Sequence, residues 1–186
     1  NGFNYSFIEK NILYDGSQLR SFFCEEVSGI RGNAIISFIG PAKVKEHMVD
    51  IEDKKNREFI FSDNMLHFII EIFDKDLLKE ILLKRLFLSI ISDEINKKIK
   101  VKRLIRRENG IYDGKKKLTV AVATCSPVSC LIHIGLNIVK TGTPIRVACL
   151  NDYKINPEKF SLKLMKLFAD EFKSVLHSPK KVKSVK

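Results

Sequence analysis

The sequence predicts an α+β fold in which a mostly antiparallel sheet is flanked by about three helices. The first observation is a series of apolar runs separated by turn signals between Asp113 and Asp152, which is typical of an antiparallel meander. The second is a pair of segments, Asp76 to Lys97 and Phe160 to Leu176, whose apolar residues recur with a helical period. The third is the order of the expected elements along the chain, which is strand, helix, strands, helix, strands, helix.

The N-terminal part predicts strands with one short helix between them. Apolar positions alternate from Phe3 to Tyr14, as in a strand. Residues Gln18 to Ser28 carry apolar side chains at helical spacing, and Gly29 is a natural helix stop. Two glycine turns flank an apolar strand from Ala34 to Ile39. The apolar run within Phe59 to Phe73 favours a strand, with a helix as the alternative.

A helix and a basic strand are expected next. Apolar residues cover most of the helical surface of Asp76 to Lys97, so this helix should be mostly buried. Basic and apolar residues are interleaved from Lys97 to Arg107, which predicts a half-exposed strand. The sequence Glu108-Asn109-Gly110 is a hairpin turn signal that leads into the meander.

The meander itself is expected to contain three strands, at Leu118 to Thr124, Leu131 to Val139 and Ile145 to Leu150. A final helix should start at Asn156-Pro157-Glu158, where a cap residue, a proline and an acid stand in the favoured order.

Length and composition suit one domain with a proper core. The chain has 186 residues, 45% of them hydrophobic and 30% charged. We expect a single domain over residues 1–177 and a disordered basic tail over residues 178–186. The formal net charge is +11, and a basic surface attracts nucleic acid or acidic partners. Lysine far exceeds arginine, which recognises phosphate better, so nucleic-acid binding ranks third among the functions that we consider.

The sequence predicts a cytoplasmic protein without a metal. It has no apolar run of ~18 residues that would span a membrane, and its N-terminus lacks the layout of a signal peptide. The four cysteines are spread along the chain, and we expect them to be reduced. Cys125 and Cys130 resemble half of a zinc site, but no second pair exists. The polar segment His47 to Asp53 matches no metal motif, and a solvated loop is favoured there.

From Arg106 to Leu176 the chain resembles the catalytic domain of biotin protein ligases and lipoate ligases. Motifs of that family have counterparts here in the same order, followed by the helix that carries Glu158. The counterparts are Asn109-Gly-Ile-Tyr112, Gly114-Lys-Lys-Lys-Leu118, Gly135-Leu-Asn-Ile138 and Ala148-Cys-Leu-Asn-Asp152.

The upstream region is more similar to octanoyltransferases of lipoate synthesis, which share that fold. Their loop resembles the segment from Arg31-Gly32-Asn33 to Gly40-Pro41. In this chain Phe38 stands near the family's histidine, and the ligases' fuller glycine-rich nucleotide loop is absent. As a whole, the sequence resembles an uncharacterised, largely archaeal conserved family that we interpret as a distant relative of these transferases.

The resemblance implies a catalytic role for Lys117, and the expected strand geometry makes Cys149 the candidate nucleophile. The alternatives are a lysine that points to water and a buried apolar cysteine. In the related enzymes a lysine binds the acyl carbonyl or the adenylate, because developing negative charge on oxygen needs a fixed cation, and Lys117 matches that position. Octanoyl transfer also needs a thiolate. If a hairpin closes at Cys125, Lys117 pairs near Leu136, and the third strand brings Cys149 to ~10 Å from Lys117. Cys149 is then a better nucleophile than Cys130, which would lie ~20 Å away.

The expected substrate site adds residues from the upstream loop and from the middle strand of the meander. Arg31, Gly32 and Gly40 would close one side of an apolar slot beside Lys117. His133 and Asn137 are polar residues within an apolar strand, and for His133 a hydrogen-bonded core histidine is the favoured alternative.

These features lead to three function hypotheses. The first is an acyltransferase or a carboxylate-adenylating ligase, which would use ATP only in the ligase case. Its ligand would be an acyl chain or small carboxylate, with an acidic carrier or lipoyl-type domain as the partner protein. The second is a non-catalytic, homo-oligomeric ligand-binding protein, because exposed sheet edges favour self-association. The third is the nucleic-acid-binding module.

Overall fold

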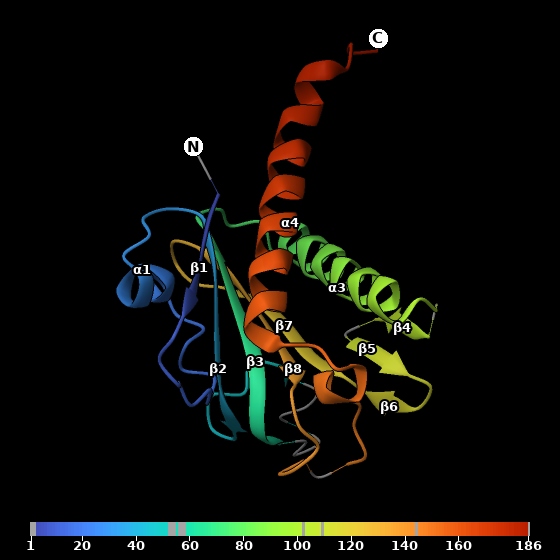
Figure 1. Ribbon diagram of the computed structural model, residues 1–186. Helices are drawn as coiled ribbons and strands as arrows, with labels where there is room; N and C mark the ends of the chain where they lie inside the picture. Colours follow the sequence, from blue (N-terminus) through green and yellow to red (C-terminus); the bar gives the residue numbers. More distant parts are fainter. Residues whose placement is uncertain are drawn as a thin grey trace.

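The computed structural model describes residues 3–51, 55, 59–101, 103–108, 110–143 and 145–185. A five-stranded sheet has the order β1-β2-β3-β8-β7, and a smaller sheet has the order β4-β5-β6 (Figure 1). Strand β1 runs parallel to β2, and the other paired strands are antiparallel. The predicted α+β class is confirmed. The strands are β1 (Asn4–Ile8), β2 (Ala34–Val44), β3 (Ile60–Ile72), β4 (Leu104–Arg107), β5 (Gly110–Asp113), β6 (Lys116–Lys117), β7 (Thr119–Cys125) and β8 (Cys130–Asn137). The helices are α1 (Phe23–Ser28), α3 (Leu77–Ile99) and α4 (Pro157–His177), with short 3-10 turns η1 (Leu150–Tyr153) and η2 (Ser178–Lys181).

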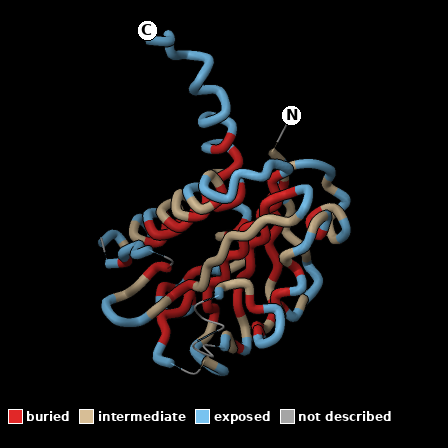
Figure 2. Tube along the Cα trace, turned by 180° about the vertical axis from the view of Figure 1, so that it is seen from behind, coloured by how far each residue is buried: buried red, intermediate tan, exposed pale blue. Residues whose placement is uncertain are grey.

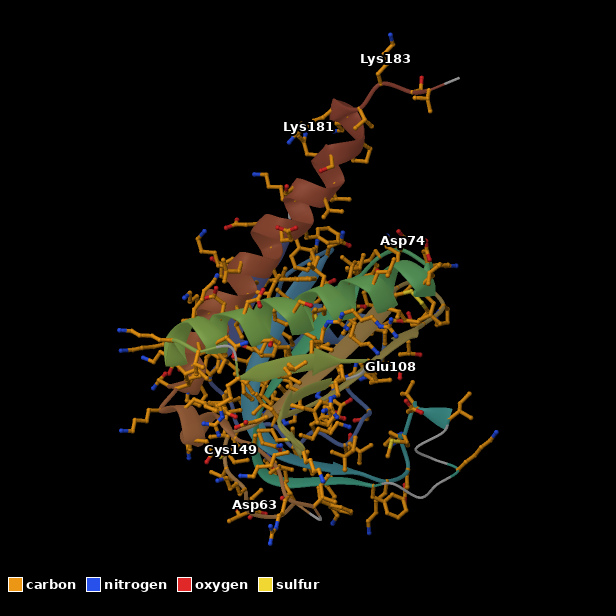
Figure 3. The ribbon with its side chains drawn as sticks, turned by 90° about the vertical axis from the view of Figure 1, so that its right-hand side faces the viewer. Asp63, Asp74, Glu108, Cys149, Lys181 and Lys183 are labelled. Carbon is orange, nitrogen blue, oxygen red and sulfur yellow. A yellow bond between two sulfur atoms is a disulfide. The ribbon has the colours of Figure 1, made fainter. Side chains whose placement is uncertain are left out.

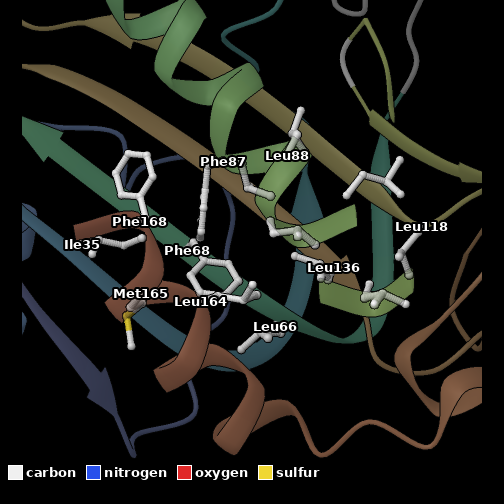
Figure 4. Close-up of a cluster of buried hydrophobic side chains, with 14 of the residues drawn as sticks. Ile35, Leu66, Phe68, Phe87, Leu88, Leu118, Leu136, Leu164, Met165 and Phe168 are labelled. Carbon is white, nitrogen blue, oxygen red and sulfur yellow. The ribbon is translucent and has the colours of Figure 1, made fainter. Parts of the chain in front are cut away.

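Helices α3 and α4 cover one face of the large sheet and leave the other face to α1 and the loops (Figure 1). The hydrophobic core lies between this face and the two helices (Figure 4). Phe87 of α3 packs at its centre, with ring centroids 5.1 Å from Phe68 of β3 and 4.9 Å from Phe168 of α4. Successive strand residues point to opposite faces of a sheet. Ile132 and Ile134 of β8 therefore lie in this core, and His133 points to the opposite face.

Both long helices begin at a side-chain cap, and the cap at Asn156 was predicted from the sequence. The Asp76 side chain accepts a hydrogen bond from the Lys79 amide at the start of α3. The Asn156 side chain accepts one from the Lys159 amide at the start of α4, with proline at the first helical position. The end of α4 projects beyond the sheet and is exposed (Figures 1 and 2). The short turn η2 extends it, and the disorder of the remaining tail stays a prediction.

Some predicted boundaries were wrong by several residues. The first strand ends at Ile8, well before Tyr14, and the first helix starts at Phe23 after a series of turns. Helix α3 continues through Ile99, so the basic strand begins only at Leu104. The prediction of a strand between Phe59 and Phe73 is confirmed by β3. Among the described residues, no helix combines the length and apolar character needed to cross a membrane.

The predicted third strand of the meander is absent. The only ladder contact that this segment makes is an isolated parallel bridge between Val147 and Lys117, and the chain turns into η1 at Leu150. The reason is that β8 already has two neighbours. Strand β7 pairs with one edge, and β3, some 60 residues earlier in the chain, pairs with the other from Met65 to Ile72.

The predicted pairing of Lys117 near Leu136 is off by two residues. The β7–β8 hairpin closes with Cys125 opposite Cys130, so Thr119 is the residue opposite Leu136. The strand breaks before Thr119, where the Leu118 amide donates to the Ile111 carbonyl at 2.8 Å. Lys117 therefore belongs to the small sheet and lies where the two sheets meet.

A disulfide joins Cys125 and Cys130 across the end of the β7–β8 hairpin. The expectation of reduced cysteines is thus wrong for this pair, and neither sulfur is free to hold zinc or carry an acyl group. Behind the disulfide, the Ser129 hydroxyl donates to the buried carboxylate of Glu71 at 2.8 Å. The same carboxylate accepts the Phe22 amide at 2.7 Å, so it ties the hairpin to the start of α1.

Reduction of this disulfide should lower the free energy of unfolding by roughly 2 kcal/mol, the value that loop-closure entropy gives for so short a loop. Thermal unfolding with and without a reductant measures the effect. The double variant Cys125→Ser/Cys130→Ser is the control, because its melting temperature should not respond to the reductant. An identical wild-type melting temperature in both buffers would contradict the disulfide.

Candidate functional site

A pocket of about 670 Å³ opens on the face of the large sheet that α3 and α4 leave uncovered. Its floor comes from β3, β7 and β8, and its walls come from the segments around Tyr14, Val44 to Asp50 and Thr143 to Val147. Most of the lining is apolar. The described lining residues that carry the argument are Tyr14, Met65, Lys117, Val120, His133 and Asn137.

Gly135 makes the floor of the pocket flat. A side-chain carbon at this position would lie 2.9 Å from Cε of Met65 and 3.2 Å from a methyl group of Val120. Both distances are shorter than ordinary contacts between carbon atoms. The two apolar side chains therefore meet above the glycine because it has no side chain.

Lys117 enters the pocket from a firmly held backbone. Lys117 pairs with Tyr112 in the small sheet, and the Lys117 carbonyl accepts a hydrogen bond from the Ala148 amide at 3.1 Å. Asn137 supports the same junction, because its side-chain nitrogen donates to the carbonyls of Leu118 at 3.2 Å and Ala148 at 3.4 Å. Lys117 is the only lysine or arginine among the described lining residues, and no ion pair between described residues involves it.

Two buried histidines form the other polar feature of the site. Nδ1 of His67 lies 3.0 Å from Nε2 of His133, and Nε2 of His67 lies 3.2 Å from the carbonyl oxygen of Gly40. The Tyr14 ring stacks on the His133 ring with centroids 3.6 Å apart and planes 15° from parallel. Burial lowers the pKa of His67 to about 4 and also lowers the pKa of His133, which His67 lowers further. Both imidazoles are therefore neutral at pH 7.

Gly40 contributes through its backbone. A side chain there would collide with the carbonyl of Ile12, so glycine lets the segment from Ile12 to Tyr14 lie against β2. Tyr14 is held there by hydrogen bonds to Pro41 and Lys43. Gly40 thus places the tyrosine ring over the histidine pair and orients His67 through its own carbonyl.

The structure places Arg31 and Gly32 outside the pocket. The Arg31 side chain is 90% exposed and pairs with Glu25 at 3.2 Å. Residue 34 of β2 lies opposite Glu71, whereas residue 40 lies opposite Met65 at the pocket. Six residues of strand separate these levels, about 20 Å. The loop at Arg31 and the lysine at the pocket are therefore not brought together.

Cys149 is also not part of the pocket lining. Its thiol is 3% exposed and accepts the Asp152 amide at the start of η1. It lies at the end of the molecule opposite the labelled tail lysines (Figure 3). Burial raises the pKa of the thiol, so the thiolate is disfavoured. The other free cysteine, Cys24, is buried beside β3, and burial raises its pKa as well.

The polar segment that starts at His47 proves to be a pocket wall, since His47 and Asp50 line the cavity. Glu52 and Asp53 lie outside the described residues. Within the described part of the chain, no group of three or more histidine, cysteine, aspartate or glutamate side chains could hold a metal ion. His67 and Tyr14 were not predicted from the sequence. The signal available was a histidine in an apolar strand, alternating with Met65 and Ile69.

Comparisons with known proteins identify relatives of this chain. A protein of unknown function from Pyrococcus horikoshi matches with a TM-score of 0.93 and 34% identity, covering 100% of both chains. An uncharacterized protein from Methanocaldococcus jannaschii is 29% identical over 155 residues, which is 80% of this chain and 70% of that protein.

More distant structures share the fold. The biotin protein ligase from Aquifex aeolicus, in complex with biotin and ATP, matches with a TM-score of 0.60 and 13% identity, covering 91% of this chain and 70% of that one. A putative lipoate protein ligase from T. acidophilum with bound lipoic acid matches with a TM-score of 0.58 and 13% identity over 91% and 86% of the two chains. At such identities the likeness establishes the biotin/lipoate ligase fold. A family model matches residues 3–183, and the chain therefore belongs to the family described as Domain of unknown function (DUF366).

Proposed function

We propose that this protein binds a small carboxylic acid or a medium-length acyl chain in the pocket, with the carboxylate or acyl oxygen at Lys117. The observation that carries the proposal is an apolar cavity of about 670 Å³ whose described lining contains a single cation. An ammonium group attracts an oxygen anion, and the apolar walls bury the chain. Biotin and lipoic acid, which are bound in the two distant ligase structures, are acids of this class.

The same arrangement suits acyl or cofactor transfer. In the transition state of acyl transfer the carbonyl oxygen gains negative charge, and a fixed cation in a site poor in water stabilises it. The backbone of Lys117 is held on both sides, by Tyr112 and by Ala148, so the base of its side chain is fixed at the edge of the pocket.

The position of the thiols favours direct transfer over a thioester on the protein. None of the four cysteines lines the pocket: Cys125 and Cys130 are joined, and Cys24 and Cys149 are buried elsewhere. Cys149→Ser should therefore leave ligand binding and any transferase activity unchanged, and acyl adducts should be absent from Cys149 by mass spectrometry. A stable octanoyl adduct on this cysteine would restore the thioester route.

ATP use receives no support from the geometry. Arg31 and Gly32, the upstream loop of the resemblance, lie about 20 Å along β2 from the pocket level. The second candidate function is ligand binding without catalysis, which is compatible with the lack of a described thiol in the pocket.

A titration experiment tests the proposal. Isothermal calorimetry with octanoate, lipoate and biotin should give saturable binding of at least one acid. Octanol is the matched probe, because it keeps the chain and lacks the anion, and it should bind more weakly. Transfer from octanoyl-CoA to an acidic carrier domain then separates the transferase from the binding protein. If octanol binds as tightly as octanoate, Lys117 has no role as the anion site.

A further inference from the structure

The end of the pocket opposite Lys117 contains a hydrogen-bond acceptor whose protonation state the fold sets. The His67–His133 pair ends on the backbone carbonyl of Gly40. A carbonyl oxygen can only accept a hydrogen bond, so Nε2 of His67 carries the proton of that ring. Since His67 is neutral, its Nδ1 is a bare acceptor and accepts a hydrogen bond from Nε2–H of His133.

These hydrogen bonds determine the tautomer of His133 as well. His133 is also neutral and carries its one proton on Nε2, so its Nδ1 is a bare lone pair. No hydrogen bond between described residues reaches this nitrogen, and His133 lines the pocket. Tyr14 holds the ring in place by stacking on it. The pocket is therefore lined by a histidine whose Nδ1 is an acceptor without a donor among the described residues.

The distance between the two polar ends sets the length of a ligand that could reach both. His133 and Asn137 lie on the same face of β8, four residues apart, which is about 13 Å along the strand. Asn137 supports the junction at Lys117, so the lysine and the histidine mark opposite ends. Between them lie Gly135 and the apolar side chains of Met65 and Val120.

We propose that Nδ1 of His133 accepts a hydrogen bond from a hydroxyl or amide N–H group at the far end of the ligand. The pocket would then select chains with a carboxylate or acyl oxygen at one end and a polar hydrogen at the other. This inference rests on the proposed function for the Lys117 end. A ligand without a hydrogen-bond donor would cover Nδ1 of His133 and leave it without a partner. Burial of an unpaired polar atom costs free energy, so the site should discriminate against such ligands.

The test compares octanoate with its omega-hydroxy derivative by calorimetry on the whole chain. The wild-type protein should bind the hydroxy acid about tenfold more tightly. His133→Phe keeps a ring for Tyr14 to stack on and removes the acceptor. In this variant the preference for the hydroxy acid should vanish. Nitrogen-15 NMR of the free protein, with labelled histidine, should find both rings neutral and protonated on Nε2.

The outcomes separate this inference from the one on which it rests. Equal binding of the two acids by the wild-type protein overturns the donor selection and leaves the Lys117 site intact. A preference that survives His133→Phe, or a proton on Nδ1 of His133, overturns it too. If neither acid binds, both proposals fall. If His133→Phe does not fold, the wild-type comparison and the NMR tautomer still decide.

Discussion

Replacing Lys117 with methionine should weaken the binding of octanoate by roughly 10- to 100-fold, because a hydrogen bond to a charged group contributes about 1.5–3 kcal/mol. Methionine keeps an unbranched apolar side chain of similar length, so the walls of the pocket should survive. The remaining affinity would come from burial of the acyl chain between Val120 and Met65. Calorimetry at a fixed low salt concentration measures the change.

Lys116→Met is the matched control for this prediction. Lys116 is the neighbouring residue of β6, is exposed and does not line the pocket. It shares the general positive field of the small sheet, so its loss should change the affinity less than twofold. Equal losses in the two variants would show that the anion responds to the net charge of the surface rather than to an ammonium group inside the pocket.

Glu80→Gln should remove a pH-dependent contribution of about 3 kcal/mol to the free energy of unfolding. Glu80 of α3 is 0% exposed, and neither carboxylate oxygen has a hydrogen-bond partner in the described structure. Burial raises its pKa from the ordinary 4.5 to about 7. The folded state therefore keeps a proton that the unfolded state loses. This stabilisation is complete below pH 4.5, falls as the pH rises towards 7, and is absent above it.

Denaturant unfolding at pH 4.5 and pH 8 measures this effect as the difference between variant and wild type. The comparison with wild type is needed because His67 also makes the free energy of unfolding depend on pH. The pKa of His67 is lowered to about 4, so its effect has the opposite sign to that of Glu80. The contribution of neutral His67 to the free energy of unfolding is lost as the pH falls from 6.5 to 4. Relative to wild type, Glu80→Gln should gain stability only at the higher pH. Asp93, an exposed acid of the same helix, offers the control Asp93→Asn, and equal behaviour of the two variants would contradict a raised pKa at Glu80.

Elements whose signals lie close together in the chain could be predicted from the sequence. Helix α4 begins at Asn156 because a cap, a proline and an acid stand together, and α3 is marked by apolar residues at a helical period. The third meander strand could not be judged in this way. Whether Ile145 to Leu150 pairs with β8 depends on which strand already occupies that edge, and this is β3.

The site was partly predictable for the same reason. Lys117 stands out as a lysine beside an apolar strand, and a resemblance in motif order pointed to it. The pairing of His67 with His133 joins residues 66 positions apart, and only the register between β3 and β8 brings them together. Arg31 illustrates the opposite case, because similarity of a short loop did not fix its distance from Lys117 along β2.

A crystal structure with octanoate tests the central claim most directly. We expect the carboxylate within about 3 Å of Nζ of Lys117, a normal distance for a charged hydrogen bond. The chain should run over Gly135 towards His133. Octanoate bound elsewhere, or bound here with its carboxylate pointing away from Lys117, would contradict the assignment of this pocket as an acyl- or carboxylate-binding site.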